Sequence, residues 1–207
     1  YLRQLGVRAV EFDVRQLHDG QLIVIHDDDF VRTTGQSQLV ESCTLAEAQQ
    51  FDHRLQWSNW TTAEYTPSLC QVLRCLSDFE HLEVEVKAVV DDAAAERLIL
   101  QLQQDLQGFE NTACITSFDV KILAALQQQQ SHFKRGLLVE LPIGAYAIEL
   151  ADQYGCCQIG WHDQLASDEL IRQTQQAGLN ISIWTVNDVE RAKHLQQLGV
   201  QGLITDV

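Results

Sequence analysis

The 207-residue chain contains no methionine, only two prolines and few basic side chains. Because methionine is absent, Tyr1 is not a translation start, and we expect residues 1–207 to be an excerpt of a longer chain. No proline-rich or glycine-serine stretch interrupts the sequence, and 45% of its residues are apolar, which is enough for a sizeable core. We therefore expect one domain over residues 1–207, incomplete at its N-terminus and also at its C-terminus.

Basic residues are outnumbered, with 14 lysines and arginines against 29 aspartates and glutamates and a net charge of -15. A chain of this charge repels nucleic-acid backbones and anionic lipid head groups, which argues against nucleic acid as a partner. An anionic substrate would need a bound cation, or a buried lysine or arginine, to offset the repulsion at its site.

Six cysteines are present, but none forms the C-x-x-C pair of zinc and redox sites. Most fall within apolar segments, so we expect buried, reduced thiols, and adjacent Cys156 and Cys157 are badly placed to pair with each other. A reducing compartment follows, and the expected location is the cytoplasm. No membrane-spanning segment is visible, so we expect no stable membrane insertion.

Short apolar strands alternate with segments of helical period along the chain. The expected strands cover residues 9–14, 82–87, 113–118, 136–139, 157–161, 181–186 and 202–205, and the expected helices cover residues 45–51, 93–106, 120–129, 145–154, 168–177 and 188–198. Gly178 and Gly199 stand where helix C-caps belong. The alternation favours a parallel sheet in a TIM (β/α)8 barrel whose first strand is missing from this chain, with a doubly wound open sheet as the alternative.

Asp19 and Gly20 stand between two apolar runs, which is typical of a hairpin turn. We therefore expect a small hairpin extension at residues 14–27. In that case Leu22 to His26 is an addition to the barrel and is not one of its strands.

Polar side chains gather where the expected strands end, which is where TIM barrels carry their chemistry. Glu11 and Asp13 close one apolar run, and Glu85 and Lys87 close another. Because side chains alternate along a strand, each pair lies on one face. Carboxylate oxygens suit a hard divalent cation such as Mg²⁺ or Ca²⁺. A simpler interpretation stays open, in which the carboxylates of Glu11 and Asp13 are only solvated and Glu85 and Lys87 form a structural ion pair.

An ordered set of segments resembles the glycerophosphodiester phosphodiesterase family, whose members adopt a TIM barrel. Gly6 to Val14 is similar to the family's segment Gly-Ala-x-x-x-Glu-x-Asp-Val, and Asp19 to Asp27 is similar to its hairpin and second catalytic histidine. The pattern continues in order with residues 32–34, 66–69, 85–87, 117–118, 184–187 and 202–206. A set in this order is more specific than any lone motif.

The resemblance implies a reaction, the metal-dependent hydrolysis of small-molecule glycerophosphodiesters to an alcohol and sn-glycerol 3-phosphate by general acid/base catalysis. It implies that Glu11, Asp13 and Glu85 bind Mg²⁺ or Ca²⁺. It further implies that Lys87 holds a phosphate oxygen and that His26 donates a proton to the leaving alcohol. No residue of the sequence identifies which alcohol leaves.

Trp184 is implied to wall the glycerol side of the substrate, with core packing as an equal alternative. The family's opening His-Arg-Gly, which carries the other catalytic histidine, has no counterpart in residues 1–207, so we expect this chain as it stands to be inactive. Arg32 is expected to anchor a loop. The remaining histidines are expected at turns, in loops or on helix surfaces.

Three other functions stay open. A Schiff-base lyase would use Lys87, although the nearby acids would keep its ammonium group protonated. A non-catalytic barrel would act as a binding module without turnover. A related phospholipase D-like phosphodiesterase would take a bulky lipid, for which the sequence shows no exposed apolar stretch.

Overall fold

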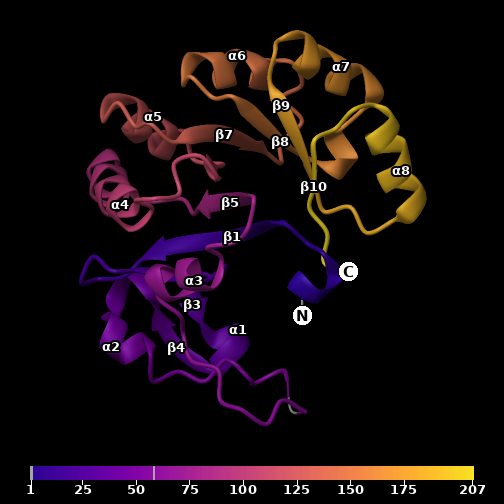
Figure 1. Ribbon diagram of the computed structural model, residues 1–207. Coiled ribbons are helices and arrows are strands. Elements are labelled where there is room, and N and C mark those ends of the chain that lie inside the picture. Colours follow the sequence, from indigo (N-terminus) through magenta and orange to yellow (C-terminus); the bar gives the residue numbers. More distant parts are fainter. Residues whose placement is uncertain (1, 58) are drawn as a thin grey trace.

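The computed structural model describes residues 2–57 and 59–207 and is built around one curled sheet (Figure 1). The strands of this sheet are β1 (Ala9–Gln16), β2 (Leu22–Val24), β5 (His81–Val86), β6 (Ala113–Ser117), β7 (Lys134–Val139), β8 (Gln158–His162), β9 (Asn180–Trp184) and β10 (Gly202–Leu203). They are hydrogen-bonded in the order β10-β9-β8-β7-β6-β5-β1-β2. All neighbours are parallel except β2, which runs antiparallel to β1. The α/β barrel architecture expected from the sequence is confirmed.

Helices follow the parallel strands and cover the outer face of the sheet (Figure 1). They are α3 (Leu69–Cys75), α4 (Asp92–Asp105), α5 (Val120–Gln128), α6 (Tyr146–Gln153), α7 (Asp168–Gln176) and α8 (Val189–Gln197). All of them except α6 begin with a side-chain cap; Asp91, for example, accepts a hydrogen bond from the backbone of α4 and Asp188 from that of α8. Gly178 and Gly199 follow α7 and α8 with φ of 78° and 80°, as the C-cap prediction required.

The expected hairpin is present where β1 runs beyond the barrel and turns back into β2. Val14 pairs with Val24, and Gln16 pairs with Leu22. Within the turn, the Asp19 carboxylate accepts a hydrogen bond from the backbone nitrogen of Gln21 at 3.2 Å. After β2 the chain enters an insertion, residues 25–68, which ends where α3 begins.

The insertion contains several short elements, most of which the sequence did not reveal (Figure 1). The unexpected ones are β3 (Asp29–Phe30), α1 (Val31–Thr34), β4 (Gln36–Leu39) and a 3-10 helix (Val40–Ser42), and the insertion also contains α2 (Leu45–Ala48). Two further 3-10 helices lie outside it at Leu2–Leu5 and Asp163–Leu165. Strand β4 is exposed along its whole length, so it lacks the apolar alternation by which strands are recognised. Helix α2 was expected, and a Thr44–Glu47 capping box fixes its start.

Buried apolar side chains form two separate clusters. The main cluster joins the sheet to its helices. The small cluster lies in the hairpin and the insertion and consists of Leu17, Ile23, Ile25, Phe30, Val40, Cys43 and Ala48. The expectation of buried cysteines is wrong for Cys70 and Cys75, which are exposed on α3.

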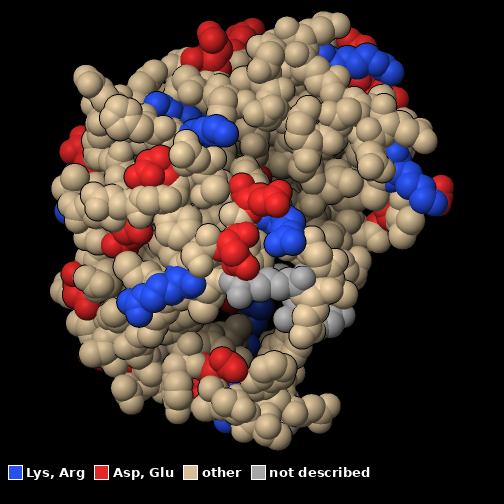
Figure 2. All heavy atoms as spheres, in the orientation of Figure 1, with Lys and Arg blue, Asp and Glu red and all other residues tan. Residues whose placement is uncertain are grey.

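Charged side chains are scattered over the face drawn in Figure 2, and one group of both signs gathers near its middle. None of the helices formed by residues 2–57 and 59–207 is long and apolar enough to cross a lipid bilayer.

Candidate active site

Three carboxylates converge in the middle of β1 and near the end of β5. In the parallel register Asp13 lies opposite Glu85, and Glu11 lies two residues before Asp13 on the same face. One carboxylate oxygen from each of these three residues lies within 4.8 Å of the others. The structure thus brings together the three acidic residues that the sequence singled out, in an arrangement that could hold a metal ion.

Glu11 is the member of this group whose carboxylate has the fewest hydrogen-bond partners among the described residues. Its Oε1 is buried and has no hydrogen-bond partner among the residues that the structure describes. Burial, followed by the charges of Asp13 and Glu85, raises its pKa to about 8. A cation placed among the three carboxylates would supply the missing partner of Oε1 and would offset the repulsion, so these residues fit a hard divalent ion.

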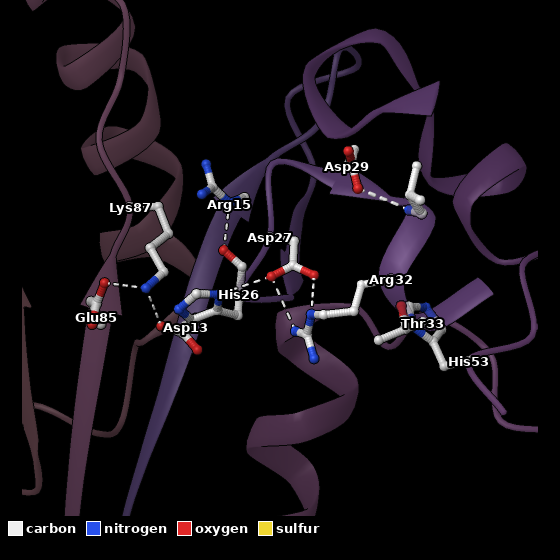
Figure 3. Close-up of polar contacts among 11 residues, drawn as sticks. Asp13, Arg15, His26, Asp27, Asp29, Arg32, Thr33, His53, Glu85 and Lys87 are labelled. Atoms are coloured by element: carbon white, nitrogen blue, oxygen red, sulfur yellow. Dashed lines mark hydrogen bonds and ion pairs between the residues drawn. The ribbon is translucent and has the colours of Figure 1, made fainter. Parts of the chain in front are cut away.

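Lys87 reaches across the same carboxylates (Figure 3). Its Nζ lies 2.6 Å from Asp13 Oδ1 and is also paired with Glu85 Oε1, and only 13% of its side chain is exposed. Burial opposes its charge, but the hydrogen bonds to Asp13 and Glu85 prevail and raise its pKa. The amine therefore stays protonated, which favours binding of a phosphate oxygen over Schiff-base chemistry.

His26 follows β2 and lies beside this group, because the Ile25 nitrogen donates a hydrogen bond to the Asp13 carbonyl at 3.1 Å. Figure 3 shows its ring between Asp13 and Asp27. The His26 side chain is 65% exposed, and its Nδ1 lies 2.9 Å from Asp27 Oδ1. The ring is thus oriented from one side and open to solvent on the other.

Asp27 is itself held by Arg32 of α1. Arg32 Nε donates to Asp27 Oδ2 at 2.6 Å, and its Nη2 donates to Asp27 Oδ1 at 3.0 Å. This hydrogen bonding lowers the pKa of Asp27, so the carboxylate stays ionised beside His26. The sequence places Asp27 next to His26, but it gives no sign that Arg32 contacts Asp27 through two hydrogen bonds. Arg32 does anchor this loop, as expected.

Trp184 ends β9 in an aromatic group with Phe118 and His162. Its ring meets Phe118 edge to face at 5.3 Å between centroids and His162 at 4.8 Å. Its Nε1 donates to the Gly160 carbonyl at 3.3 Å. The ring is half-buried, so it is fixed by packing and still presents an accessible surface at the strand ends.

Two expectations about histidines were wrong. His162 was expected in an exposed loop, but it is half-buried at the end of β8, and His81 was expected at a turn or on a helix surface, but it begins β5. His53 lies in a turn, as expected, where its Nδ1 lies 2.9 Å from Thr33 Oγ1 and its Nε2 lies 2.7 Å from Thr66 Oγ1. Burial lowers the pKa of His53, so it acts as a neutral bridge between α1 and the segment before α3.

A second acidic residue of β5, Glu83, is buried inside the curled sheet. Gln158 donates to its Oε2 at 2.9 Å, and Ser182 donates to its Oε1 at 3.1 Å. Gly160 leaves room for this network, because a Cβ there would lie 3.0 Å from Ser182 Oγ. The network ties β5 to β8 and β9 and was not visible in the sequence.

We expect Gln158→Leu to lower the free energy of unfolding by about 1–3 kcal/mol, because the buried Glu83 carboxylate loses a donor. Urea denaturation measures this change. The matched control is Gln197→Leu on the exposed side of α8, which should alter stability by less than about 0.5 kcal/mol. Equal effects of the two substitutions would show that the Glu83 network adds no stability.

Comparison with known proteins gives a consistent result. Residues 3–207 match the glycerophosphoryl diester phosphodiesterase family. A glycerophosphodiester phosphodiesterase of Caldanaerobacter subterraneus is 28% identical over 219 residues, which cover 98% of this chain and 84% of the relative. A putative glycerophosphodiester phosphodiesterase of Bacillus subtilis is 26% identical over 205 residues, covering 98% of this chain and 84% of the relative.

Solved structures share the fold. A phosphodiesterase of Oleispira antarctica, in complex with the product sn-glycerol-3-phosphate, superposes with a TM-score of 0.86 at 22% identity, covering 98% of this chain and 83% of that one. A glycerophosphodiester phosphodiesterase of Agrobacterium tumefaciens superposes with a TM-score of 0.78 at 24% identity, and the match covers 98% of this chain and 85% of that one.

Proposed function

The chain belongs to the glycerophosphoryl diester phosphodiesterase family, and from this we propose that it hydrolyses glycerophosphodiesters to an alcohol and sn-glycerol 3-phosphate. The substrate is a small molecule with one negative charge at its phosphodiester. A chain with a net charge of -15 needs local positive charge to bind it. In the candidate active site Lys87 would supply part of that charge, and a cation held by Glu11, Asp13 and Glu85 would supply the rest.

The observation that carries the proposal is the convergence of Glu11, Asp13 and Glu85, together with a buried Glu11 oxygen that has no hydrogen-bond partner in the described part of the chain. We propose these three residues as the ligands of Mg²⁺ or Ca²⁺. Such an ion, when bound, stabilises negative charge on the phosphoryl oxygens and lowers the pKa of the attacking nucleophile. Asp13 and Glu85 would share their oxygens between this ion and Lys87.

Lys87 acts on the phosphate from the same edge of the sheet. Its ammonium group is held by Asp13 and Glu85, so its position is fixed before substrate arrives. It would donate a hydrogen bond to a non-bridging phosphate oxygen. This contact would hold the phosphate so that the nucleophile attacks phosphorus opposite the oxygen of the leaving alcohol.

His26 would give a proton to the oxygen of the leaving alcohol. Asp27 fixes the ring through Nδ1, which leaves Nε2 free to face the substrate. Arg32 keeps Asp27 in place. Trp184, held by its aromatic neighbours, would form the wall on the glycerol side of the substrate.

The direct test uses the full-length gene product, because residues 1–207 alone contain no counterpart of the family's His-Arg-Gly and are expected to be inactive. It measures release of glycerol 3-phosphate from glycerophosphocholine with Mg²⁺ or Ca²⁺ and with excess EDTA. We expect turnover that EDTA abolishes and that either added cation restores. A coupled assay for glycerol 3-phosphate distinguishes this product from phosphocholine, which would result from cleavage at the other ester bond.

Turnover that survives EDTA would contradict the role given to Glu11, Asp13 and Glu85. No turnover of glycerophosphocholine, or of its ethanolamine, glycerol and inositol analogues, by folded protein with cation present would contradict the proposed reaction. Circular dichroism of the same sample establishes that the protein is folded.

A further inference from the structure

His162 stands at the end of β8 but has no role in the reaction described above. The direction of its side chain follows from Gly160 on the same strand, where a Cβ would lie 3.8 Å from Glu83 Oε1 inside the curled sheet. Side chains two residues apart on a strand share a face, so His162 also points to the inside, one layer nearer the carboxyl ends of the strands. Glu85 lies two residues beyond Glu83 on β5. His162 therefore belongs to the same layer of inward side chains as the proposed cation ligand Glu85.

The strand order places His162 across the barrel from the proposed general acid. Strand β8 lies four places from β1 in the sheet, which is half of the way round an eight-stranded barrel. His26 follows β2, which is paired with the other edge of β1. A phosphodiester held between these two sides would direct its leaving alcohol toward His26 and its glycerol toward β8.

Hydrogen bonding fixes both the ring of His162 and the position of its proton. The backbone nitrogen of Gln164 donates to His162 Nδ1 at 3.3 Å, which caps the 3-10 helix Asp163–Leu165. A neutral imidazole whose Nδ1 accepts a hydrogen bond carries its proton on Nε2. Within residues 2–57 and 59–207, Nε2 has no hydrogen-bond partner. Its N–H group is therefore free to bind a ligand.

The wall around this donor is aromatic. Trp184 lies opposite His162 in the parallel register of β8 and β9, and the two rings meet edge to face. Phe118 packs against the other side of Trp184. The indole N–H of Trp184 already donates to the Gly160 carbonyl, so His162 Nε2 is the one free ring donor of these three side chains. A single donor on an apolar wall orients a ligand that has both carbon atoms and hydroxyl groups.

We propose that His162 selects the glycerol part of the substrate by donating a hydrogen bond from Nε2 to one of its hydroxyl oxygens. The inference rests on the proposed function and adds a specificity-determining residue to it. Choline would gain nothing from this donor, because its quaternary ammonium group has no lone pair. The glycerol of a glycerophosphodiester has two free hydroxyls, and its carbon atoms would lie against Trp184. A substrate without the recognised hydroxyl would leave the N–H group unpaired and would be disfavoured.

The test compares glycerophosphocholine with the phosphocholine esters of propane-1,2-diol and propane-1,3-diol, each of which lacks one glycerol hydroxyl. For the full-length gene product we expect kcat/KM to be at least about tenfold lower with one of these analogues. His162→Phe should lower kcat/KM for glycerophosphocholine by a similar factor and leave the value for that analogue unchanged, so that the preference disappears. The matched control is His132→Phe, which alters an exposed histidine before β7 and should change neither value.

Two further variants separate the roles of the two ring nitrogens. His162→Gln can place an amide N–H where Nε2 stands, so it should retain much of the preference for glycerophosphocholine. His162→Asn can place its amide oxygen where Nδ1 stands and keep the cap of the 3-10 helix, but it has no donor at the position of Nε2. It should therefore lose the preference. The reverse order of these two variants would show that His162 acts only as a helix cap and would overturn the proposal.

The proposal also fails if the unaltered protein cleaves all three substrates alike, or if His162→Phe lowers kcat/KM for all three by the same factor. If no substrate is cleaved, the proposed function fails separately. Titration calorimetry with glycerol 3-phosphate and with the phosphates of the two propanediols then tests His162. Loss of the preference for glycerol 3-phosphate in His162→Phe supports the proposal, and equal preference in the two proteins overturns it.

Discussion

Replacing Glu85 with glutamine should weaken cation binding and phosphodiester hydrolysis together. The substitution removes one of three carboxylates whose oxygens lie within 4.8 Å of one another, and it also removes an ion-pair partner of Lys87. We expect kcat/KM to fall by more than about 100-fold, since partners outside the ligand set already cost 10–100-fold at metal sites. Glycerol 3-phosphate release across a Mg²⁺ or Ca²⁺ titration measures the activity, and titration calorimetry measures the cation affinity.

Glu149→Gln provides the matched control for Glu85→Gln, because Glu149 is exposed on α6 and carries the same change in charge. It should leave both cation affinity and turnover unaltered. If Glu85→Gln loses activity while its cation affinity matches that of the unaltered protein, Glu85 is not a ligand and acts only through Lys87.

Replacing His26 with alanine should leave cation affinity intact and lower kcat by about 10²–10⁴-fold, the usual contribution of a general acid. The side chain is 65% exposed and is separate from the three carboxylates, so its removal should not disturb either the fold or the cation site. His132→Ala is the control, because it removes an exposed histidine from the loop before β7.

The leaving group gives a sharper test of the His26 role. In the p-nitrophenyl ester of glycerol 3-phosphate, the leaving p-nitrophenolate is stable without a proton. His26→Ala should therefore lose far less activity with this substrate than with glycerophosphocholine. Equal losses with the two substrates would show that His26 does not protonate the leaving alcohol. A parallel loss of cation affinity would place His26 with the ligands.

Much of the barrel and the centre of its candidate active site were predictable from local patterns. Alternation along a strand places Glu11 with Asp13 and Glu85 with Lys87, and parallel strands bring such pairs to one edge of a sheet. The long helices carry apolar residues at helical spacing, as in α4, where Ala95, Leu98, Ile99 and Leu102 are buried.

What the sequence did not reveal depends on short elements or on distant pairs. Helix α1 has four residues and no buried one, so nothing in its pattern announces that it holds Arg32 against Asp27. The Glu83–Ser182 hydrogen bond joins residues 99 apart, and only the curvature of the sheet brings them together.

The two apolar clusters divide the candidate active site between them. Asp13 and Glu85 stand on strands packed in the main cluster, whereas His26 follows Ile25 and precedes Phe30, both members of the small cluster. The residues proposed to bind the cation and the phosphate thus stand on a different packed support from the residue proposed to protonate the leaving alcohol. If these roles hold, changes confined to the small cluster could alter the leaving-alcohol side during evolution or by design and leave the proposed cation ligands unaltered.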